Sequence, residues 1–444
     1  MKLIIKNGHV VDPANKIDEV MDILVEGGKI SKVARAIDAK AETVIDAAGK
    51  IVMPGIVDMH VHLREPGRED KETVFSGTKA AAKGGVTSVL AMPNTLPSLD
   101  SAEIINTLKD IIKKTANVDV FICGAITIGR QGKELVGMGI LKKEGVIAIS
   151  DDGASVDSDE LMLKALKEAK KEKLLVICHS EDKSLSGQGV VNRGFTSTRL
   201  GLRGISKESE YKRVARDIKL AEESGASVHI AHLSCAESVE IIRKAKKKGV
   251  KVTAETAPHY FSLSEESLLG YNTNMKINPP LRTKEDILAI IEGLKDGTID
   301  VIASDHAPHT ENEKEIEFEY AEFGSIGLET ELAVSFTELV NCGLLIWSEL
   351  VKKISFNPSK ILDIDKGTLG FGKDADITIV SPEKEWVVNK VGFVSKSKNS
   401  AFIGKKLKGI VGYTISKGKI VYKTSPFAER EIFRSPNGEV GMAK

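Results

Sequence analysis

Eight short apolar runs, separated by longer segments of helical period, constrain the fold of this chain more than any other feature. The runs are rich in β-branched residues and occupy Ile56–His60, Thr87–Met92, Val118–Ala125, Val146–Ile149, Leu174–His179, Ser227–His232, Val250–Glu255 and Ile299–Ser304. Near-continuous apolar strands suit a parallel sheet that is covered by helices. Eight βα units over about 300 residues predict a (β/α)8 TIM-like barrel of the α/β class. A doubly wound open sheet is the alternative, but no glycine-rich dinucleotide fingerprint follows the first strand.

Helices are expected between these strands, with glycine where several of them end. The spacing of apolar residues predicts helices over Ser101–Thr115, Asp159–Lys171, Glu208–Ser224 and Ala236–Lys248. Gly84-Gly85, Gly225 and Gly249 follow predicted helices, where glycine commonly terminates the helix in a left-handed conformation. The alternation of strand and helix therefore continues through the middle of the chain.

The two ends of the chain have a different texture. Residues 1–52 alternate with a period near two, and the same pattern returns after Lys366. Neither end is able to bury a core alone, so we expect the two together to form a small β-sandwich beside the barrel. The expected domains are residues 1–52 and 366–444 for the sandwich, the latter with a polar tail from Thr424, and residues 53–365 for the catalytic barrel. Two unrelated terminal decorations are the alternative.

Composition argues against several classes of protein. Lys+Arg and Asp+Glu both number 63, and no long basic run indicates a nucleic-acid or membrane-surface partner. The four cysteines are widely separated and form no CxxC, which argues against a disulfide framework or a cysteine zinc site. The N-terminus lacks the apolar core of a signal peptide, and no run approaches the roughly 18–20 apolar residues of a membrane span. We therefore expect a cytoplasmic protein.

Histidines and aspartates fall at the carboxyl ends of the predicted strands. His60 and His62 close the first strand, and residues two apart in an extended segment point the same way. The fourth, fifth, sixth and eighth strands are followed or closed by Asp151-Asp152, His179, His232 and Asp305. In a barrel these ends gather on one face, where such enzymes place their active sites. Scattered structural histidines have no reason to cluster there.

Imidazole and carboxylate groups in this number predict a catalytic metal centre. Six nitrogen and oxygen ligands exceed one closed tetrahedral zinc site, but they suffice for two ions that share a bridging carboxylate. The ligand types favour zinc, with manganese, cobalt or iron as alternatives. A bound metal lowers the pKa of its water towards 7 and so supplies hydroxide, and Asp305 could be both a ligand and a proton shuttle. Asp152 is preferred over Asp151, which could instead cap the following turn.

Four polar residues near these strand ends are candidate substrate contacts. The planar fork of Arg64 suits a carboxylate, Asn94 and Asn278 could bind amide edges, and His309 could bind an anion. These contacts imply a substrate that carries both a carboxylate and an amide. The alternatives are an ion pair of Arg64 with a neighbouring acid, turn formation by the two asparagines beside proline, and a surface position for His309.

Several motifs together resemble type I dihydroorotase, a family of the amidohydrolase superfamily. The stretches that carry the resemblance extend across nearly the whole chain: Asp58-Met59-His60-Val61-His62-Leu63-Arg64-Glu65-Pro66-Gly67, Ala91-Met92-Pro93-Asn94-Thr95, Ser150-Asp151-Asp152-Gly153, Asn278-Pro279-Pro280-Leu281-Arg282, Ser304-Asp305-His306-Ala307-Pro308-His309 and Gly327-Leu328-Glu329-Thr330. The resemblance implies reversible cyclisation of N-carbamoyl-L-aspartate to L-dihydroorotate in pyrimidine synthesis. It also implies a zinc centre, with two Zn2+ ions per subunit, in a distorted barrel beside a β-sandwich.

The resemblance assigns roles residue by residue. It implies that Asp152 bridges the metals, and that Arg64, Asn94 and His309 anchor the substrate carboxylate. It places Asn278 and the backbone near Phe323 and Gly324 against the substrate ring. The full set of implied metal ligands is His60, His62, Asp152, His179, His232 and Asp305.

Two features separate this chain from related patterns. Many superfamily members bridge two metals through a carboxylated lysine after the fourth strand, whereas Lys142 and Lys143 precede that strand here. This argues against a hydantoinase or an allantoinase, which are the alternative enzymes. Glu322 stands where the family often has proline, and an acid there could weaken the binding of an anion or point outward.

The resemblance also suggests how the chain could assemble and move. A homodimer is expected, with possible association with aspartate transcarbamoylase. A non-catalytic subunit that stabilises such a partner is the alternative from another class, although inactive relatives have usually lost metal ligands and all six positions are filled here. The charged loop between His309 and Phe323 is a candidate mobile lid.

Overall fold

Eight parallel strands form the centre of the molecule. The computed structural model describes residues 2–424, and the expected polar tail beyond Thr424 lies outside the described residues. The barrel strands are β6 (Ile56–Val61), β7 (Val86–Ala91), β8 (Asp119–Gly124), β9 (Ala148–Ile149), β10 (Leu175–Cys178), β13 (Val228–Ile230), β14 (Val252–Thr256) and β15 (Val301–Ile302). Each pairs in parallel with the next in chain order. The predicted (β/α)8 barrel is confirmed, and the open sheet is excluded.

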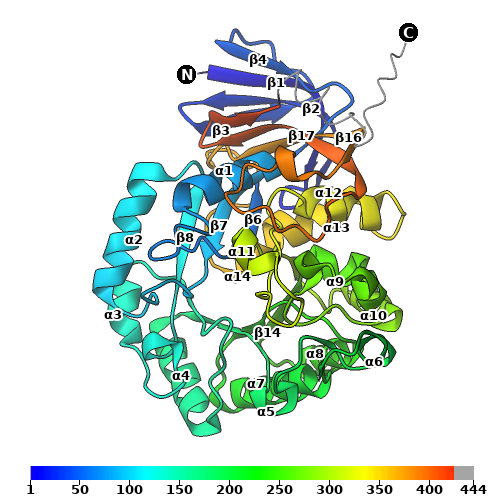
Figure 1. Cartoon of the computed structure of the whole chain (residues 1–444). Coiled ribbons are helices and arrows are strands. Elements are labelled where there is room, and N and C mark those ends of the chain that lie inside the picture. Colours follow the sequence, from blue (N-terminus) through cyan, green and yellow to red (C-terminus); the bar gives the residue numbers. More distant parts are fainter. Residues whose placement is uncertain (1, 425–444) are drawn as a thin grey trace.

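Helices surround the barrel on its outer side (Figure 1). Their bounds are α1 (Val74–Gly84), α2 (Ala102–Thr115), α3 (Met138–Lys143), α4 (Asp159–Glu172), α5 (Lys183–Ser186), α6 (Phe195–Leu200), α7 (Glu208–Ser224), α8 (Ala236–Lys247), α9 (Pro258–Ser262), α10 (Lys284–Lys295), α11 (Glu311–Lys314), α12 (Glu331–Ser335), α13 (Trp347–Val351) and α14 (Asn357–Ile361). Gly85 and Gly225 end α1 and α7 with φ of 89° and 63°, as the sequence predicted. Among the described residues, no helix has the length and apolar character that a membrane span requires.

Two barrel strands are shorter than their apolar runs, and they make the barrel irregular. Residues 146–149 and 299–304 give regular ladders of only two residues each, in β9 and β15. The last strand nevertheless closes on the first, because the backbone N–H of His62 donates to the carbonyl of His306 over 2.9 Å. The buried carboxylate of Asp58 also accepts from the N–H of Ser304 at 3.3 Å. Closure therefore brings the end of the eighth strand beside His60 and His62.

The remaining long strands form a second sheet that draws on both ends of the chain. Its members are β1 (Lys2–Asp12), β2 (Ile17–Glu26), β3 (Lys29–Ala34), β4 (Thr43–Asp46), β5 (Ile51–Pro54), β16 (Ile377–Val387), β17 (Lys406–Ser416) and β18 (Lys419–Lys423). β5 joins the two ends, since it pairs with β1 on one side and with β16 on the other. The sheet packs around an apolar core of its own, which includes Leu3, Ile23 and Ile377. A domain built from both termini beside the barrel is thus confirmed (Figure 1). A further short pair, β11 (Val191–Asn192) and β12 (Gly204–Ile205), lies apart from both sheets.

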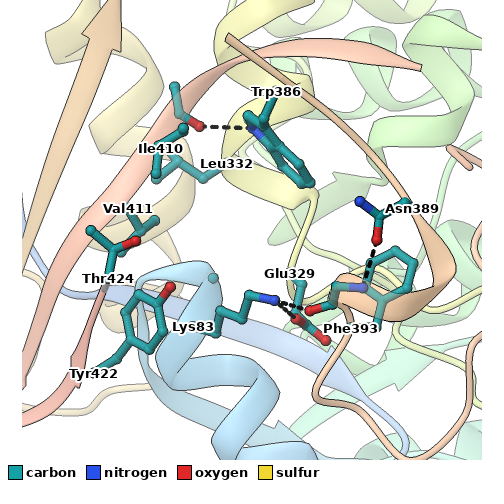
Figure 2. Close-up of a pocket in the computed structure, with 14 residues that line it drawn as sticks. Lys83, Glu329, Leu332, Trp386, Asn389, Phe393, Ile410, Val411, Tyr422 and Thr424 are labelled. Atoms are coloured by element: carbon teal, nitrogen blue, oxygen red, sulfur yellow. Dashed lines mark hydrogen bonds and ion pairs between the residues drawn. The ribbon is translucent and has the colours of Figure 1, made fainter. Parts of the chain in front are cut away.

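An apolar hollow marks the junction between the barrel helices and this sheet. Figure 2 shows the hollow, which measures about 640 Å³ and has Leu332, Trp386 and Phe393 in its wall. Lys83 of α1 and Glu329 form an ion pair of 2.9 Å at its edge. None of the candidate metal or substrate residues lines it. The hollow belongs to the packing of the two parts and is separate from the chemistry described below.

We expect Ile377→Ala to destabilise the protein by about 2–5 kcal/mol, because it removes a fully buried side chain from the core of the terminal sheet. Urea unfolding followed by circular dichroism measures the change. Ile140→Ala is the matched control, since Ile140 is 58% exposed and its loss should cost about 0.5 kcal/mol or less. Equal effects of the two substitutions would contradict the proposed core.

Candidate active site

Six side chains from five strand ends converge at the carboxyl face of the barrel. Asp152 lies at the centre, and its two carboxylate oxygens lie 3.3–3.8 Å from nitrogen atoms of four histidines, namely His60, His62, His179 and His232. Asp305 Oδ1 lies 3.3 Å from His62 Nε2 and 3.7 Å from His60 Nε2. His179 Nδ1 and His232 Nε2 are 2.8 Å apart. The structure therefore brings together all six residues that the sequence predicted as ligands.

The donor set fits divalent cations. His60 Nε2 and Asp152 Oδ1 are buried and have no hydrogen-bond partner among the described residues, although both point into the cluster. Candidate ligand atoms of His60, His62 and Asp305 lie within 4.8 Å of one another, as do those of His60, Asp152 and His232. Two overlapping groups that share His60, each with its own carboxylate, suit a pair of ions better than one closed tetrahedral site.

The electrostatics of the site favours positive charge within the cluster of histidines and aspartates. Burial opposes ionisation of Asp152, but His60, His179 and His232 outweigh burial and hold its pKa well below the usual value. Burial likewise opposes a proton on His60, yet Glu255 and Asp152 raise its pKa well above the ordinary range. The carboxylates thus favour cationic partners, which bound metal ions would supply in place of the imidazole protons.

A second layer of acids holds the histidines in place. Glu255, at the end region of β14, accepts from His60 Nδ1 over 2.5 Å and lies 3.2 Å from His229 Nε2. This contact orients His60 with its Nε2 towards the cluster, as outer-layer carboxylates do in metal sites. His229 reaches the cluster only through Glu255, and its other ring nitrogen lies 2.8 Å from Thr253 Oγ1. His229 thus contacts Glu255 and is not one of the six clustered residues.

The two neighbouring aspartates after β9 point in different directions. Asp151 accepts from the backbone N–H groups of Ile126 and Thr127 at 2.8 and 3.1 Å, so its carboxylate fixes the segment after β8 and not the turn that follows Asp151, which the sequence suggested it could cap. Asp152 faces the histidines. Lys142 and Lys143 end α3, before β9 begins. A lysine therefore does not reach the central position, which Asp152 fills.

Three residues of the site have a left-handed backbone that non-glycine residues seldom adopt. Their φ angles are 61° for Arg64, 35° for His232 and 46° for Asp305. Such conformations cost free energy and cluster at functional sites, where the surrounding structure enforces them. Here the strand ends must turn sharply to direct these side chains into one space.

A hollow of about 970 Å³ opens beside the cluster, and every predicted substrate contact lines it. These residues are Arg64, Asn94, Asn278, His309, Phe323 and Gly324. Arg64 and His309 lie together, because Arg64 Nη2 is 3.3 Å from His309 Nε2, and Arg64 Nε donates to the carbonyl of Pro308 at 3.2 Å. The geometry brings an arginine fork and an imidazole to one point at the edge of the candidate metal centre.

The two predicted asparagines have protein partners as well as a face on the hollow. Asn94 Oδ1 lies 2.7 Å from His62 Nδ1, which leaves the Asn94 amide N–H groups free to face a ligand. Asn278 Nδ2 donates to Glu181 Oε2 over 3.1 Å, and the same oxygen lies 3.4 Å from His179 Nε2. Each asparagine is therefore tied to the surroundings of a candidate metal ligand.

The candidate lid is fastened on both sides in the structure. Arg68 and Lys71 reach Glu313 of α11 at 2.7 and 2.9 Å. Lys314 is buried, and its Nζ donates to the carbonyls of Glu322 and Gly324 over 2.6 and 3.0 Å. Glu322 lies at the wall of the hollow with an exposed side chain. Movement of the loop stays a prediction.

Sequence reasoning missed Glu255, Glu181 and Lys71. Glu181 follows His179 by two residues, the spacing that linked His60 to His62, and it does line the hollow. Glu255 is a charged residue within an otherwise apolar strand, which is a usable signal for a buried polar role. Lys71 has no such signal in the sequence, because it lies in a charged segment that is typical of an exposed surface.

Comparison with known proteins identifies the family. The family model "Dihydro-orotase-like" matches residues 49–238. A protein of Elusimicrobium minutum named dihydroorotase is 54% identical over 420 residues, which cover 95% of this chain and 97% of that protein. One from Geobacter metallireducens, with the same name, is 52% identical over 424 residues that cover 95% and 100%. The chain belongs to the dihydroorotase family.

Solved structures show that the dihydroorotase fold of this chain is shared more widely. An L-hydantoinase (dihydropyrimidinase) from Arthrobacter aurescens superposes with a TM-score of 0.87 over 95% of this chain and 96% of that chain, at 26% identity. A D-hydantoinase gives 0.84 over 95% of both chains, also at 26% identity. The barrel and terminal sheet are therefore common to cyclic amidohydrolases.

We expect Glu255→Gln to weaken the binding of divalent metal by about 10–100-fold, because it removes the charge that holds His60 towards the cluster. Competition with a chromogenic chelator measures the dissociation constant. Thr253→Val is the control, since it changes only the far side of His229 and should leave metal affinity nearly unchanged. An unaltered affinity in Glu255→Gln would contradict the role of Glu255.

Proposed function

We propose that this chain is a dihydroorotase, which interconverts N-carbamoyl-L-aspartate and L-dihydroorotate in pyrimidine synthesis. The observation that carries the proposal is the pairing of Arg64 and His309 beside a cluster of six metal-ligand side chains. The identity of more than half with proteins named dihydroorotase supports it. Both compounds carry a carboxylate that does not react, remote from the amide bond that forms or breaks, and the hollow offers a partner for each.

Substrate recognition rests on the residues at the rim. Arg64 and the amide of Asn94 would hold the carboxylate together with His309, since a planar guanidinium pairs with a carboxylate through two hydrogen bonds. Asn278 and the backbone at Phe323 and Gly324 would lie against the ring on the other side. In this arrangement the ring amide would lie over the cluster of histidines and aspartates.

We infer that two Zn2+ ions occupy the cluster. His60, His62 and Asp305 would hold one ion, His179 and His232 the other, with Asp152 between them. Bound zinc would supply Lewis-acid activation of a carbonyl and lower the pKa of a water molecule. The protein itself fixes the orientation of these imidazoles, because Glu255 contacts His60 and Asn94 contacts His62.

Asp305 is placed to move the proton. Burial raises the pKa of Asp305, but His62, His60 and His232 lower it by more than burial raises it. The carboxylate is therefore ionised at neutral pH and can accept a proton. In hydrolysis, water adds to the ring carbonyl carbon, the C–N bond breaks, and Asp305 carries a proton from the water to the departing nitrogen. The reverse reaction consumes one proton and releases water as the side-chain carboxylate condenses with the carbamoyl nitrogen, so mildly acidic pH favours cyclisation.

The location of the protein in the cell and its assembly are part of the same proposal. We expect a cytoplasmic homodimer, as the resemblance to type I dihydroorotases implies. Association with aspartate transcarbamoylase would bring the source of N-carbamoyl-L-aspartate close to this site. Light scattering of the purified chain, alone and mixed with that enzyme, measures both.

We expect purified, zinc-loaded protein to turn over L-dihydroorotate and N-carbamoyl-L-aspartate, and to leave hydantoin and allantoin unchanged. The discrimination should depend on Arg64, so Arg64→Met should lose about 10²-fold or more in kcat/KM for L-dihydroorotate, mainly through KM. Arg64→Lys keeps the charge without the fork and serves as the matched variant, with an intermediate loss. Turnover of hydantoin or allantoin by the wild type would refute the assignment.

Asp305→Asn should retain the fold and at least one metal ion but lose about 10²–10⁴-fold in kcat, since the amide cannot accept a proton. Steady-state kinetics gives the rate, and metal analysis of the same sample separates lost chemistry from lost metal. Near-normal turnover in this variant would rule out Asp305 as the proton carrier.

A further inference from the structure

His309 lies between two side chains that can only donate hydrogen bonds. Its Nδ1 is 3.1 Å from Lys71 Nζ, and its Nε2 is 3.3 Å from Arg64 Nη2. Lysine and arginine carry no acceptor. The ring itself is buried, and the backbone N–H of His309 donates to Asn399 Oδ1 at 3.1 Å, which fixes the residue in place. The environment of the imidazole is therefore built from cations on both edges.

This environment keeps the imidazole neutral. Burial, and then the charges of Arg64, Lys71 and Lys314, lower the pKa of His309 to about 2, against a weaker opposing effect of Glu313. A neutral imidazole has one N–H group and one lone pair. Only one of its two nitrogens can accept from a cation, and the other must direct an N–H towards one.

We propose that Lys71 fixes His309 as the tautomer protonated on Nε2, so that this N–H and the Arg64 guanidinium both point at the place of the substrate carboxylate. Lys71 donates to Nδ1, which leaves the proton on Nε2 facing Arg64. Two donors 3.3 Å apart without an acceptor between them form a site that an anion completes. Lys71 is a positioning residue that acts through His309, and the assignment of the anion to substrate rests on the proposed function.

The competing tautomer would place the proton on Nδ1 and donate it to Glu313. That contact is longer, since Glu313 Oε2 lies 3.5 Å from Nδ1. Both Glu313 oxygens are already engaged. Oε1 accepts from Arg68 and Lys71 at 2.7 and 2.9 Å, and Oε2 accepts from the backbone N–H of Thr310 at 3.0 Å. Glu313 thus holds Lys71 against Nδ1, and the geometry favours the Nε2-protonated form.

Nitrogen-15 NMR of protein labelled in the histidine ring tests the proposal without any substrate. Long-range ¹H–¹⁵N spectra distinguish the two tautomers, and comparison with His309→Asn assigns the signals of His309. We expect the Nε2-protonated form in the wild type, and the other form or a mixture in Lys71→Met. Lys71→Arg keeps a donor and should preserve the wild-type form.

Arg68→Met is the matched control, because it removes a neighbouring cation from the same Glu313 without touching the ring. It should leave the tautomer unchanged, and circular dichroism establishes the fold of each variant. A wild-type ring protonated on Nδ1 would overturn the proposal, as would a pure Nε2-protonated ring in folded Lys71→Met. If Lys71→Met does not fold, the wild-type and Lys71→Arg spectra still decide.

Kinetics then connects the tautomer to binding. Lys71→Met should raise KM for L-dihydroorotate about ten-fold with little change in kcat, and Lys71→Arg should restore most of the loss. A fall in kcat at constant KM would contradict a role at the carboxylate. Because the spectra are recorded without substrate, a correct tautomer in a protein with no dihydroorotase activity would defeat the proposed function and leave the positioning role intact.

Discussion

The buried carboxylate of Asp152 is the charge on which the rest of the site depends. A carboxylate removed from water costs several kcal/mol unless it is paired, so its position requires cationic or hydrogen-bonding partners on nearly every side. Four histidines provide them, and they come from the ends of three different strands. Those strands can deliver their side chains to one point only if the sheet closes. The contacts of Asp58 and His62 with the eighth strand are therefore as important to the centre as the ligands themselves.

Charge is segregated across the pocket. Beneath the cluster lie the buried acids Asp58, Glu255 and Glu331. Burial raises the pKa of Glu331 well above its usual value, with added repulsion from the other two. On the opposite side, the guanidinium of Arg64 lines the hollow and meets His309. Under the proposed function, the acids around the cluster would hold cations and Arg64 would hold an anion, which would orient a substrate that has a carboxylate at one end and an amide at the other.

The sequence predicted what depends on local period and missed what depends on distant packing. The two-residue spacing of His60 and His62, and the strand ends after which Asp152 and Asp305 fall, follow from alternation along the chain and from the geometry of a barrel. The partner of His60 is Glu255, 195 positions away, and the partner of His309 is Lys71, 238 positions away. No periodicity relates such pairs, because they meet only when strands and loops of different βα units pack together. The short ladder of β15 has the same origin, since bonds from neighbouring loops replace regular pairing there.

This chain shares its fold with hydantoinases, and a small number of positions would account for a difference in substrate. The hydantoinase structures share the barrel and the terminal sheet, so those elements cannot select a carboxylated substrate. Under the proposed function, the selecting groups would be those on the loops that follow the strands, where Arg64 and His309 meet. Such groups must be rigid to discriminate between substrates with and without the carboxylate. A donor that can turn away loses little free energy when the carboxylate is missing, because it can find another partner. The strained backbone of Arg64, the asparagine that fixes His309, and the Lys71–Glu313 pair all limit that freedom. Under the proposed function, the selectivity of this chain would thus depend on how the loops are held as much as on which side chains they carry.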